Sequence, residues 1–243
     1  MVFNIEVDDL REDLRSLSSV KRAKVLSGFF KTGKGQYAEG DLFLGVSVAK
    51  SRVVAKKYNN LKFSAIKILL KSKIHEERLL ALLILVDQFS QGDKKQKEKI
   101  CNFYLGQTKY VNNWDLVDLT ADKIVGAYLL NKPKSILYKL AKSDNLWERR
   151  IAIVATYNFI KNNNFNETLK IAEILLPDKH DLIQKAVGWM MREVGKRDQT
   201  MLEDFLKKNY QKLSRITLRY AIEKFPSELR KTYLSRTPLF CFG

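Results

Sequence analysis

The stretch EERLLALLILVDQFS, residues 76–90, decides the fold of this chain. Its apolar residues occupy most of the circumference of a helix, which is typical of a helix that is buried on nearly all sides. In nearly every other segment apolar residues recur at the three-to-four spacing of amphipathic helices, and no stretch alternates as a strand does. We therefore expect an all-α fold. Further helices are expected at Ser47–Tyr58, Asn113–Leu130, Leu146–Lys161, Glu167–Leu176, Asp181–Lys196 and Thr217–Lys224.

Weak internal sequence similarity indicates that these helices form a structural repeat. The segments near Arg78, Arg149 and Lys185 each open with a basic residue, followed three positions later by Ala or Gly on an apolar face. Helix pairs with short connections recur at roughly 35 residues, as in HEAT-like solenoids. We expect one domain over residues 1–243, an α-α superhelix of HEAT-like antiparallel pairs that forms a curved solenoid with a concave basic cleft, and a flexible tail at 235–243. A generic helical bundle is the alternative.

The charge of the chain indicates its partner. The 44 Lys and Arg residues outnumber the 27 Asp and Glu residues, for a formal net charge of +17. Such an excess favours a polyanion, because each phosphate that is neutralised releases a condensed counterion. Nucleic acid is the first interpretation, and a membrane surface, an RNA–protein assembly or no polyanion at all are the alternatives.

Several protein classes are excluded by composition. With 11 Gly and 4 Pro the chain is poor in the turn residues of an all-β sandwich. The apolar run Leu79–Val86 is too short to cross a bilayer, and the acidic start Met1–Leu10 is unlike a signal peptide. Two cysteines, Cys101 and Cys241, predict neither disulfides nor a zinc site. We expect a cytoplasmic protein with no metal and no cofactor, and a monomer, since no heptad seam is visible.

A tryptophan and a carboxylate form the first candidate site. Trp114 and Asp118 are four residues apart and share one face of a helix that Asn113 caps, whereas Leu116 and Val117 supply its buried face. An indole ring beside a carboxylate suits a cationic ligand, because the ring offers its negative π-face and the carboxylate a full charge. The alternative is that Trp114 packs in the core and Asp118 pairs with a lysine.

A second tryptophan lies in a basic stripe. Lys185, Trp189 and Arg192 share one helix face, and the interior Gly188 costs about 1 kcal/mol relative to alanine. Close approach of another helix, or room beside Trp189, would justify this cost. Core packing of Trp189 is the alternative. In the Arg149-Arg150 pair consecutive side chains point about 100° apart, so we expect one of them to face the cleft and contact phosphate. A solvated pair is the equal alternative.

One irregular segment, residues 31–46, interrupts the helices. It holds four of the eleven glycines but lacks the Gly-Lys-Ser/Thr run of a phosphate-binding Walker loop. Its Lys31 and Lys34 suit a phosphate contact, and an ordinary connecting loop is the equal alternative. The two histidines, His75 and His180, form neither a metal cluster nor a Ser-His-Asp set, and no Cys-x-x-Cys deaminase signature is visible.

These segments together resemble the DNA alkylation repair family of the AlkD type, the HEAT-like-repeat DNA glycosylases. The resemblance runs from about residue 20 to residue 225. Its motifs are specific together and weak separately. They are Asn113-Trp114-Asp115-Leu116-Val117-Asp118, Asp144-Asn145-Leu146-Trp147-Glu148-Arg149-Arg150-Ile151-Ala152, Gln184-Lys185-Ala186-Val187-Gly188-Trp189-Met190-Met191-Arg192-Glu193, Phe43-Leu44-Gly45-Val46 and Arg219-Tyr220-Ala221-Ile222.

The resemblance implies a function and a role for each matched residue. It implies excision of N3- and N7-alkylated purines from double-stranded DNA without flipping of the base, with Asp118 as the catalytic carboxylate. Trp114, Trp189 and Arg150 would line the cleft at the lesion. This chain departs from some family members by carrying Phe29-Phe30 where they have a tyrosine, which puts a hydroxyl contact there in doubt. The expected contacts to the DNA backbone are Arg149, Lys185, Arg192 and Arg219.

Two other functions remain open. The first is a DNA-binding or damage-recognition protein of the same fold without activity, which Asp118 beside Trp114 disfavours. The second is a helical-repeat scaffold for an acidic protein partner, which the basic residues at the helix starts disfavour.

Overall fold

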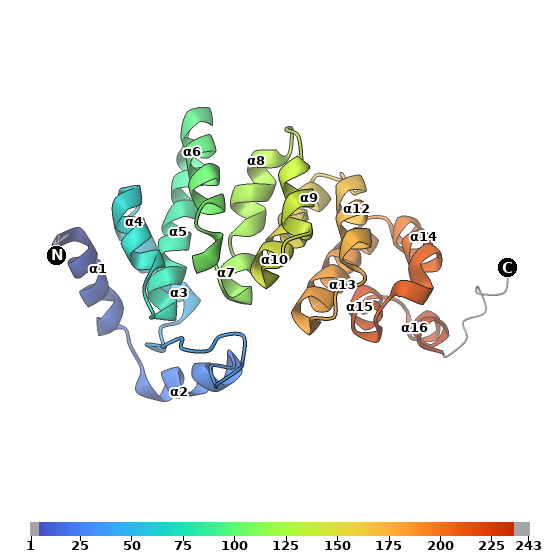
Figure 1. Cartoon of the computed structure of the whole chain (residues 1–243), viewed down its shortest axis with the longest axis horizontal. Helices are drawn as coiled ribbons and strands as arrows, with labels where there is room; N and C mark the ends of the chain where they lie inside the picture. Colours follow the sequence, from blue (N-terminus) through green and yellow to red (C-terminus); the bar gives the residue numbers. More distant parts are fainter. Residues whose placement is uncertain (1–4, 236–243) are drawn as a thin grey trace. The chain divides into compact units, whose positions relative to one another are not determined.

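The computed structural model describes residues 5–235, which are mostly helical, with one long irregular connection between α2 (Val20–Phe29) and α3 (Val48–Lys57) (Figure 1). The all-α prediction is confirmed. Between residues 5 and 235 the β structure is confined to one isolated bridge between Leu42 and Ile74. The predicted tail comprises residues 235–243, and all of it except Ser235 lies outside the described residues.

The chain divides into two compact units, Met1–Thr120 and Ala121–Gly243. Most of the helices in each unit are joined by short loops, as the HEAT-like prediction requires, and the irregular segment between α2 and α3 is the exception. The single curved solenoid and its concave basic cleft stay predictions. The helices of the first unit are α1 (Ile5–Ser16), α2 (Val20–Phe29), α3 (Val48–Lys57), α4 (Phe63–Leu70), α5 (His75–Gln91), α6 (Lys94–Leu105), η1 (Thr108–Tyr110) and α7 (Trp114–Asp118). Those of the second are η2 (Asp122–Gly126), α8 (Ala127–Leu129), α9 (Ser135–Ala141), α10 (Leu146–Ala155), α11 (Tyr157–Lys161), α12 (Asn166–Leu175), α13 (Asp181–Gly195), α14 (Gln199–Asn209), η3 (Tyr210–Lys212), α15 (Arg215–Ala221) and α16 (Ser227–Leu234).

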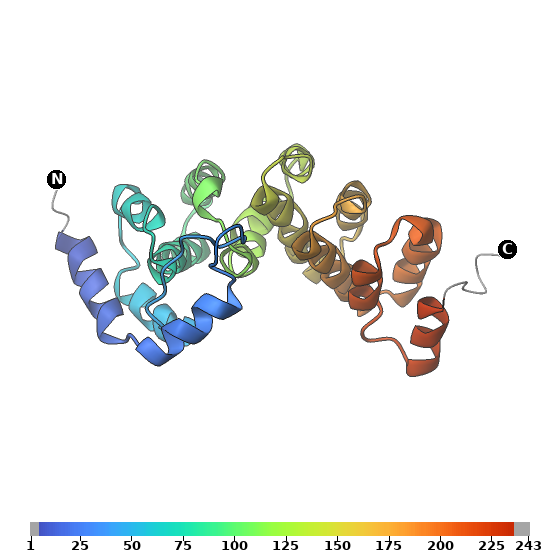
Figure 2. The same cartoon turned by 60° about the horizontal axis from the view of Figure 1, so that its bottom comes forward.

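Helix α5 is the core of the first unit, as its composition predicts. All residues from Leu79 to Leu85 are buried, and the helix packs against α3, α4 and α6 (Figures 1 and 2). Burial extends into the charged first turn at His75–Arg78, where the sequence shows no apolar residue. A buried charged turn is costly unless each side chain is paired, so the partners of these four residues constrain the surrounding elements.

Two helices that the periodicity predicts as continuous are interrupted. The predicted helix Asn113–Leu130 consists of α7, the π-helical turn η2 and α8, and Leu146–Lys161 consists of α10 and α11. A threonine lies in each break, and its hydroxyl donates to a carbonyl one turn earlier: Thr120 to Leu116 at 2.5 Å, and Thr156 to Ile153 at 2.6 Å. Such side-chain bonds compete with the helical ladder, and hydropathy does not reveal them.

The interior glycine of α13 permits a close helix contact. A Cβ atom at Gly188 would lie 2.6 Å from the Thr217 carbonyl oxygen and 2.5 Å from the Tyr220 Cβ on α15. Helices α13 and α15 therefore approach more closely than an alanine would allow, which explains why glycine occupies this position despite its low helix propensity.

We expect Gly188→Ala to lower the free energy of unfolding by about 1–3 kcal/mol, because backbone and a Cβ atom must move to admit the methyl group. Urea unfolding followed by circular dichroism measures this change. Gly28→Ala in α2 is the matched control, since open space surrounds that position, and alanine there should leave stability unchanged or raise it by up to about 1 kcal/mol. Equal effects of the two substitutions would contradict the close contact.

Candidate functional site

Trp114 and Asp118 line one pocket of the first unit, as their spacing predicts. Helix α7 begins at Trp114 because the Asn113 side chain accepts a hydrogen bond from the Trp114 backbone N–H at 2.8 Å. Leu116 and Val117 are fully buried, which turns the two half-buried site residues to the opposite face. The pocket encloses about 300 Å³ and is mainly aromatic and aliphatic. It is lined by Arg22, Leu26, Phe29, Phe30, Phe43, Val46, Val48, His75, Glu76, Leu79, Trp114, Asp115, Asp118 and Leu119.

Aromatic rings hold Trp114 in place. The Phe30 ring stacks on the indole with centroids 5.0 Å apart and an interplanar angle of 13°. Phe29 meets the indole edge-on at 5.7 Å. The indole Nε1–H donates to the Tyr37 hydroxyl at 3.3 Å. A tyrosine hydroxyl is therefore present beside Trp114, although residues 29 and 30 are both phenylalanine. The tryptophan is therefore stacked against the pocket wall rather than fully enclosed in the core.

His75 links this aromatic cluster to α7. Its ring lies 4.6 Å from Phe43 and 5.0 Å from Phe30 between centroids, and it is only 2% exposed. Its Nε2 lies 2.8 Å from the Asp115 carboxylate, and its Nδ1 lies 3.4 Å from the Asp41 carboxylate. His75 thus fixes the first turn of the helix that carries Asp118.

Two carboxylates set the charge state of His75. Burial has the largest influence on the pKa of His75 and works to lower it, but the hydrogen bonds to Asp115 and Asp41 outweigh burial, so this pKa is raised above its ordinary value of 6.5. Burial likewise works to raise the pKa of Asp41, yet the hydrogen bond from His75 and the charge of Arg78 lower it overall. The geometry therefore favours an imidazolium between two carboxylates.

The next two residues of α5 bind two other segments. The Glu76 carboxylate accepts hydrogen bonds from three consecutive backbone N–H groups, those of residues 44–46, at 2.8–3.2 Å. Glycine is needed at position 45, because its φ is +81° and a Cβ atom there would lie 2.2 Å from the Ser19 carbonyl oxygen at the start of α2. Glu77 accepts from Arg11 of α1 at 3.0 Å. These contacts bind the irregular segment and α1 to the start of α5.

The irregular segment 31–46 is part of the pocket wall, which sequence reasoning did not foresee. Its Phe43 lines the pocket, and its Tyr37 accepts the hydrogen bond from the Trp114 indole. Its Asp41 accepts a hydrogen bond from Arg78 at 2.6 Å. Lys31 and Lys34 are exposed, and their contact with phosphate stays a prediction. The only signal in the sequence was the density of aromatic and charged residues between the glycines.

The predicted residues of the second unit have the following surroundings. Trp189 is half-buried, with its ring 5.9 Å from that of Tyr157. Lys185 pairs with Asp181 at 2.7 Å, and Arg192 contacts Glu223 and Glu193. Both cations of the predicted stripe are thus paired within the chain.

The two adjacent arginines of α10 also bind their own chain. Arg149 donates to the Asp178 carboxylate at 2.6 Å and to the carbonyls of Ser143 and Asp144 at 2.9 Å. Arg150 is 5% exposed and donates to the Leu182 carbonyl at the start of α13. Arg219, in contrast, is exposed on α15. Arg149 therefore holds two loops in place and Arg150 holds the start of α13, whereas Arg219 is accessible to a ligand.

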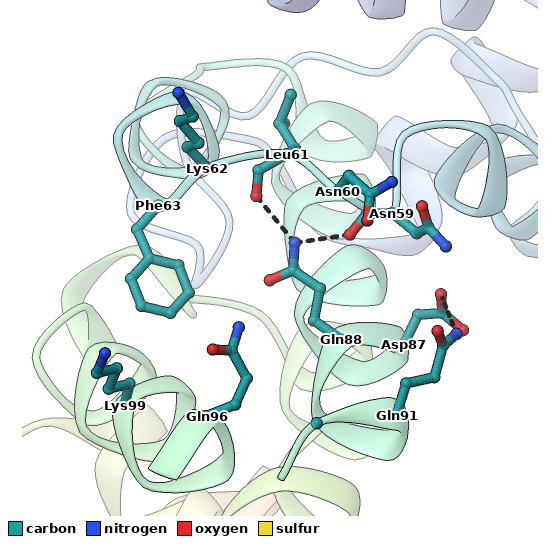
Figure 3. A pocket seen from close by; sticks show the side chains of 11 residues that line it. Asn59, Asn60, Leu61, Lys62, Phe63, Asp87, Gln88, Gln91, Gln96 and Lys99 are labelled. Atoms are coloured by element: carbon teal, nitrogen blue, oxygen red, sulfur yellow. Dashed lines mark hydrogen bonds between the residues drawn. The ribbon is translucent and has the colours of Figure 1, made fainter.

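A second pocket lies at the opposite end of α5, with a volume of about 570 Å³ (Figure 3). Its lining is rich in amides, but the Gln88 side chain already donates to the carbonyls of Asn59 and Leu61 at 2.7 and 2.8 Å and so secures the α3–α4 connection. This pocket is larger than the one beside Trp114 but lacks its combination of indole and carboxylate.

The described residues also bear on two other kinds of site. None of the helices between residues 5 and 235 is long and apolar enough to cross a membrane. In the same range no group of three or more His, Cys, Asp or Glu side chains is placed to hold a metal ion.

Comparisons with known proteins agree with the fold. The sequence model of one family, described as "DNA alkylation repair enzyme", matches residues 10–225. A solved structure described as a predicted DNA alkylation repair enzyme from Enterococcus faecalis is 17% identical, with a TM-score of 0.69, over 86% of this chain and 97% of the other. AlkD2 from Streptococcus mutans is 17% identical, with a TM-score of 0.56, over 91% and 97%. No curated protein matches the sequence. At this identity the two structures show the fold alone.

The raised pKa of His75 predicts how stability depends on pH. The stabilisation by the imidazolium is complete below about pH 6.5, the unfolded value, and is lost as the pH rises through the raised pKa of the folded state. The urea concentration at which half of the protein is unfolded should therefore decrease as the pH is raised from about 6 to about 9. His75→Asn should be less stable at the lower pH and should flatten this dependence.

His180→Asn is the matched control, because His180 is the other histidine and caps α13 at a more exposed position. Asparagine is a good N-cap, so this variant should keep the pH dependence of the parent. A His75→Asn variant whose midpoint still falls with pH as steeply as the parent would show that another group titrates.

Proposed function

Because the chain belongs to the DNA alkylation repair enzyme family, we propose that it is a DNA glycosylase that removes N3- and N7-alkylated purines from double-stranded DNA. This proposal rests on one observation: the Asp118 carboxylate and the Trp114 indole line the same pocket. The net charge of +17 supports DNA as the partner.

The residues of the pocket suit a cationic leaving group. Alkylation at N3 or N7 places a positive charge on the purine, so the base leaves without being protonated by an acid. The bond between C1′ and the base nitrogen breaks with its electron pair on the base, which neutralises the base and leaves an oxocarbenium-like sugar. Water then adds to C1′ and loses a proton, leaving an abasic site. This hydrolysis needs neither a redox cofactor nor a metal.

Asp118 would stabilise the sugar cation and orient or deprotonate the water. Two unit charges about 4 Å apart interact by about 4 kcal/mol at an intermediate dielectric, which corresponds to about three orders of magnitude in rate. Trp114 would add about 0.5–2 kcal/mol of preference for a cationic base over a neutral one. The carboxylate therefore supplies most of the catalysis, and the indole supplies selectivity.

The residues expected to contact DNA differ in how accessible they are. The exposed Arg219 is available for a phosphate, whereas Arg149, Lys185 and Arg192 would have to share or exchange their carboxylate partners. We therefore propose Arg219 as the principal backbone contact among these four. The lesion contacts of Arg150 and Trp189 stay predictions of the resemblance, and Arg150, which is 5% exposed and donates to the Leu182 carbonyl, would have to leave this partner to reach DNA.

A DNA-binding protein of the same fold without catalytic activity is the second candidate. It would use the same positive charge, but it would not need a carboxylate in an aromatic pocket, where that carboxylate repels phosphate. The location of Asp118 therefore favours the enzyme, and base release separates the two candidates.

We expect Asp118→Asn to slow release of 7-methylguanine and 3-methyladenine from methylated duplex DNA by about 100-fold or more, while the affinity for undamaged duplex is kept or rises. Chromatography of the released bases measures the rate. Asp87→Asn is the control, because Asp87 is also a half-buried carboxylate of the first unit but lines the other pocket. If the parent protein frees neither base over hours at micromolar enzyme, the binding protein becomes the better candidate.

Trp189→Ala should weaken binding of alkylated duplex more than binding of undamaged duplex, because the indole prefers a cationic base. Competition binding with the two duplexes measures the ratio. Tyr128→Ala, which removes another half-buried ring from the second unit, should leave this ratio unchanged. Equal losses of affinity for both duplexes would contradict a role for Trp189 at the lesion.

A further inference from the structure

The segment 31–46 is held rigidly at its C-terminal end. Residues 44–46 are bound by Glu76, Asp41 is bound by Arg78, and Leu42 exchanges backbone hydrogen bonds with residues 73 and 75 at 2.8–2.9 Å. Ala38 is buried, with 3% exposure. A segment tied by this many contacts to the start of α5 can position a side chain, unlike a connector that only spans two helices.

Tyr37 stands next to this fixed part and reaches the site. Its hydroxyl accepts the hydrogen bond from the Trp114 Nε1–H at 3.3 Å, and both side chains are half-buried. The two residues are 77 positions apart in the sequence, so the contact is tertiary and is not a by-product of local geometry.

The hydrogen bond constrains a motion that stacking leaves free. The nearly parallel Phe30 ring fixes the plane of the indole, but stacked rings slide and rotate in their common plane at little cost. A hydrogen bond donated by the Nε1–H is directional, and this N–H lies in that plane. Phe30 and Tyr37 together therefore determine both the tilt and the in-plane orientation of Trp114, and with them the edge that faces the pocket shared with Asp118.

We propose that Tyr37 is a positioning residue for Trp114, so that the segment 31–46 sets the geometry of the lesion-binding wall. The effect of Tyr37 on catalysis rests on the proposed glycosylase function, but its effect on the indole does not. Tyr37 need not touch the substrate: it acts through the indole, whose alignment with the carboxylate determines how well a cationic base is held beside Asp118.

The first test observes the indole directly. In ¹H–¹⁵N spectra of the full chain the three tryptophans give three indole signals, and Trp114→Phe identifies one of them. Tyr37→Phe removes only the hydroxyl, so it should shift this signal upfield and speed its exchange with solvent. Tyr58→Phe is the matched control, because the Tyr58 hydroxyl also makes a tertiary hydrogen bond in the same unit, in this case by donating to Asp13 at 2.8 Å. An unmoved Trp114 signal in Tyr37→Phe overturns the proposal.

The second test measures the consequence for catalysis. Tyr37→Phe should slow single-turnover release of methylated purines about three- to tenfold, the loss expected for one neutral hydrogen bond. Its melting temperature and its affinity for undamaged duplex should match those of Tyr58→Phe. A shifted indole signal with an unchanged rate would overturn the positioning role. If the parent protein releases no base, the proposed function fails, and the indole signal still decides whether Tyr37 positions Trp114.

Discussion

The structure of the first unit depends on pairing four buried charged side chains in one helical turn. His75, Glu76, Glu77 and Arg78 are each 3% exposed or less, and each binds a partner outside the turn, with Asp41 shared by His75 and Arg78. Removing one partner would leave a buried charge uncompensated, which costs far more than the pair contributes when intact. The segments that carry these partners, α1, α7 and residues 31–46, are therefore held in place by the free-energy cost of leaving a buried charge unpaired.

The candidate site follows from this requirement. His75 fixes Asp115, Asp115 belongs to the same five-residue helix as Asp118, and the ring of His75 supports the Phe30 that stacks on Trp114. The pocket lining is mainly apolar, and the charged His75, Glu76 and Asp115 that also line it are bound to partners within the chain. The wall around the Asp118 carboxylate is therefore fixed, as pre-organised electrostatic stabilisation requires.

The sequence predicted most of the fold and part of the site. The all-round apolar helix, the interior Gly188 and the shared face of Trp114 and Asp118 follow from local periodicity, and the structure shows each of them. The roles of His75 and Tyr37 could not be predicted, because their partners are 40 and 77 residues away and no spacing encodes them. The breaks at Thr120 and Thr156 were missed for a related reason: hydropathy does not distinguish a threonine that bonds to its own helix from one that does not.

The shortness of α7 has a consequence for how the protein would fail under stress. A helix of five residues is not stable alone, so Trp114 and Asp118 keep their places only through tertiary contacts such as those of Asp115 and Phe30. Local opening of this turn would cost less than unfolding the α5 core. Heating would therefore disrupt the candidate site while the bulk of the helices remain folded, so the useful lifetime of the protein would be set by the five-residue α7 rather than by the long α5.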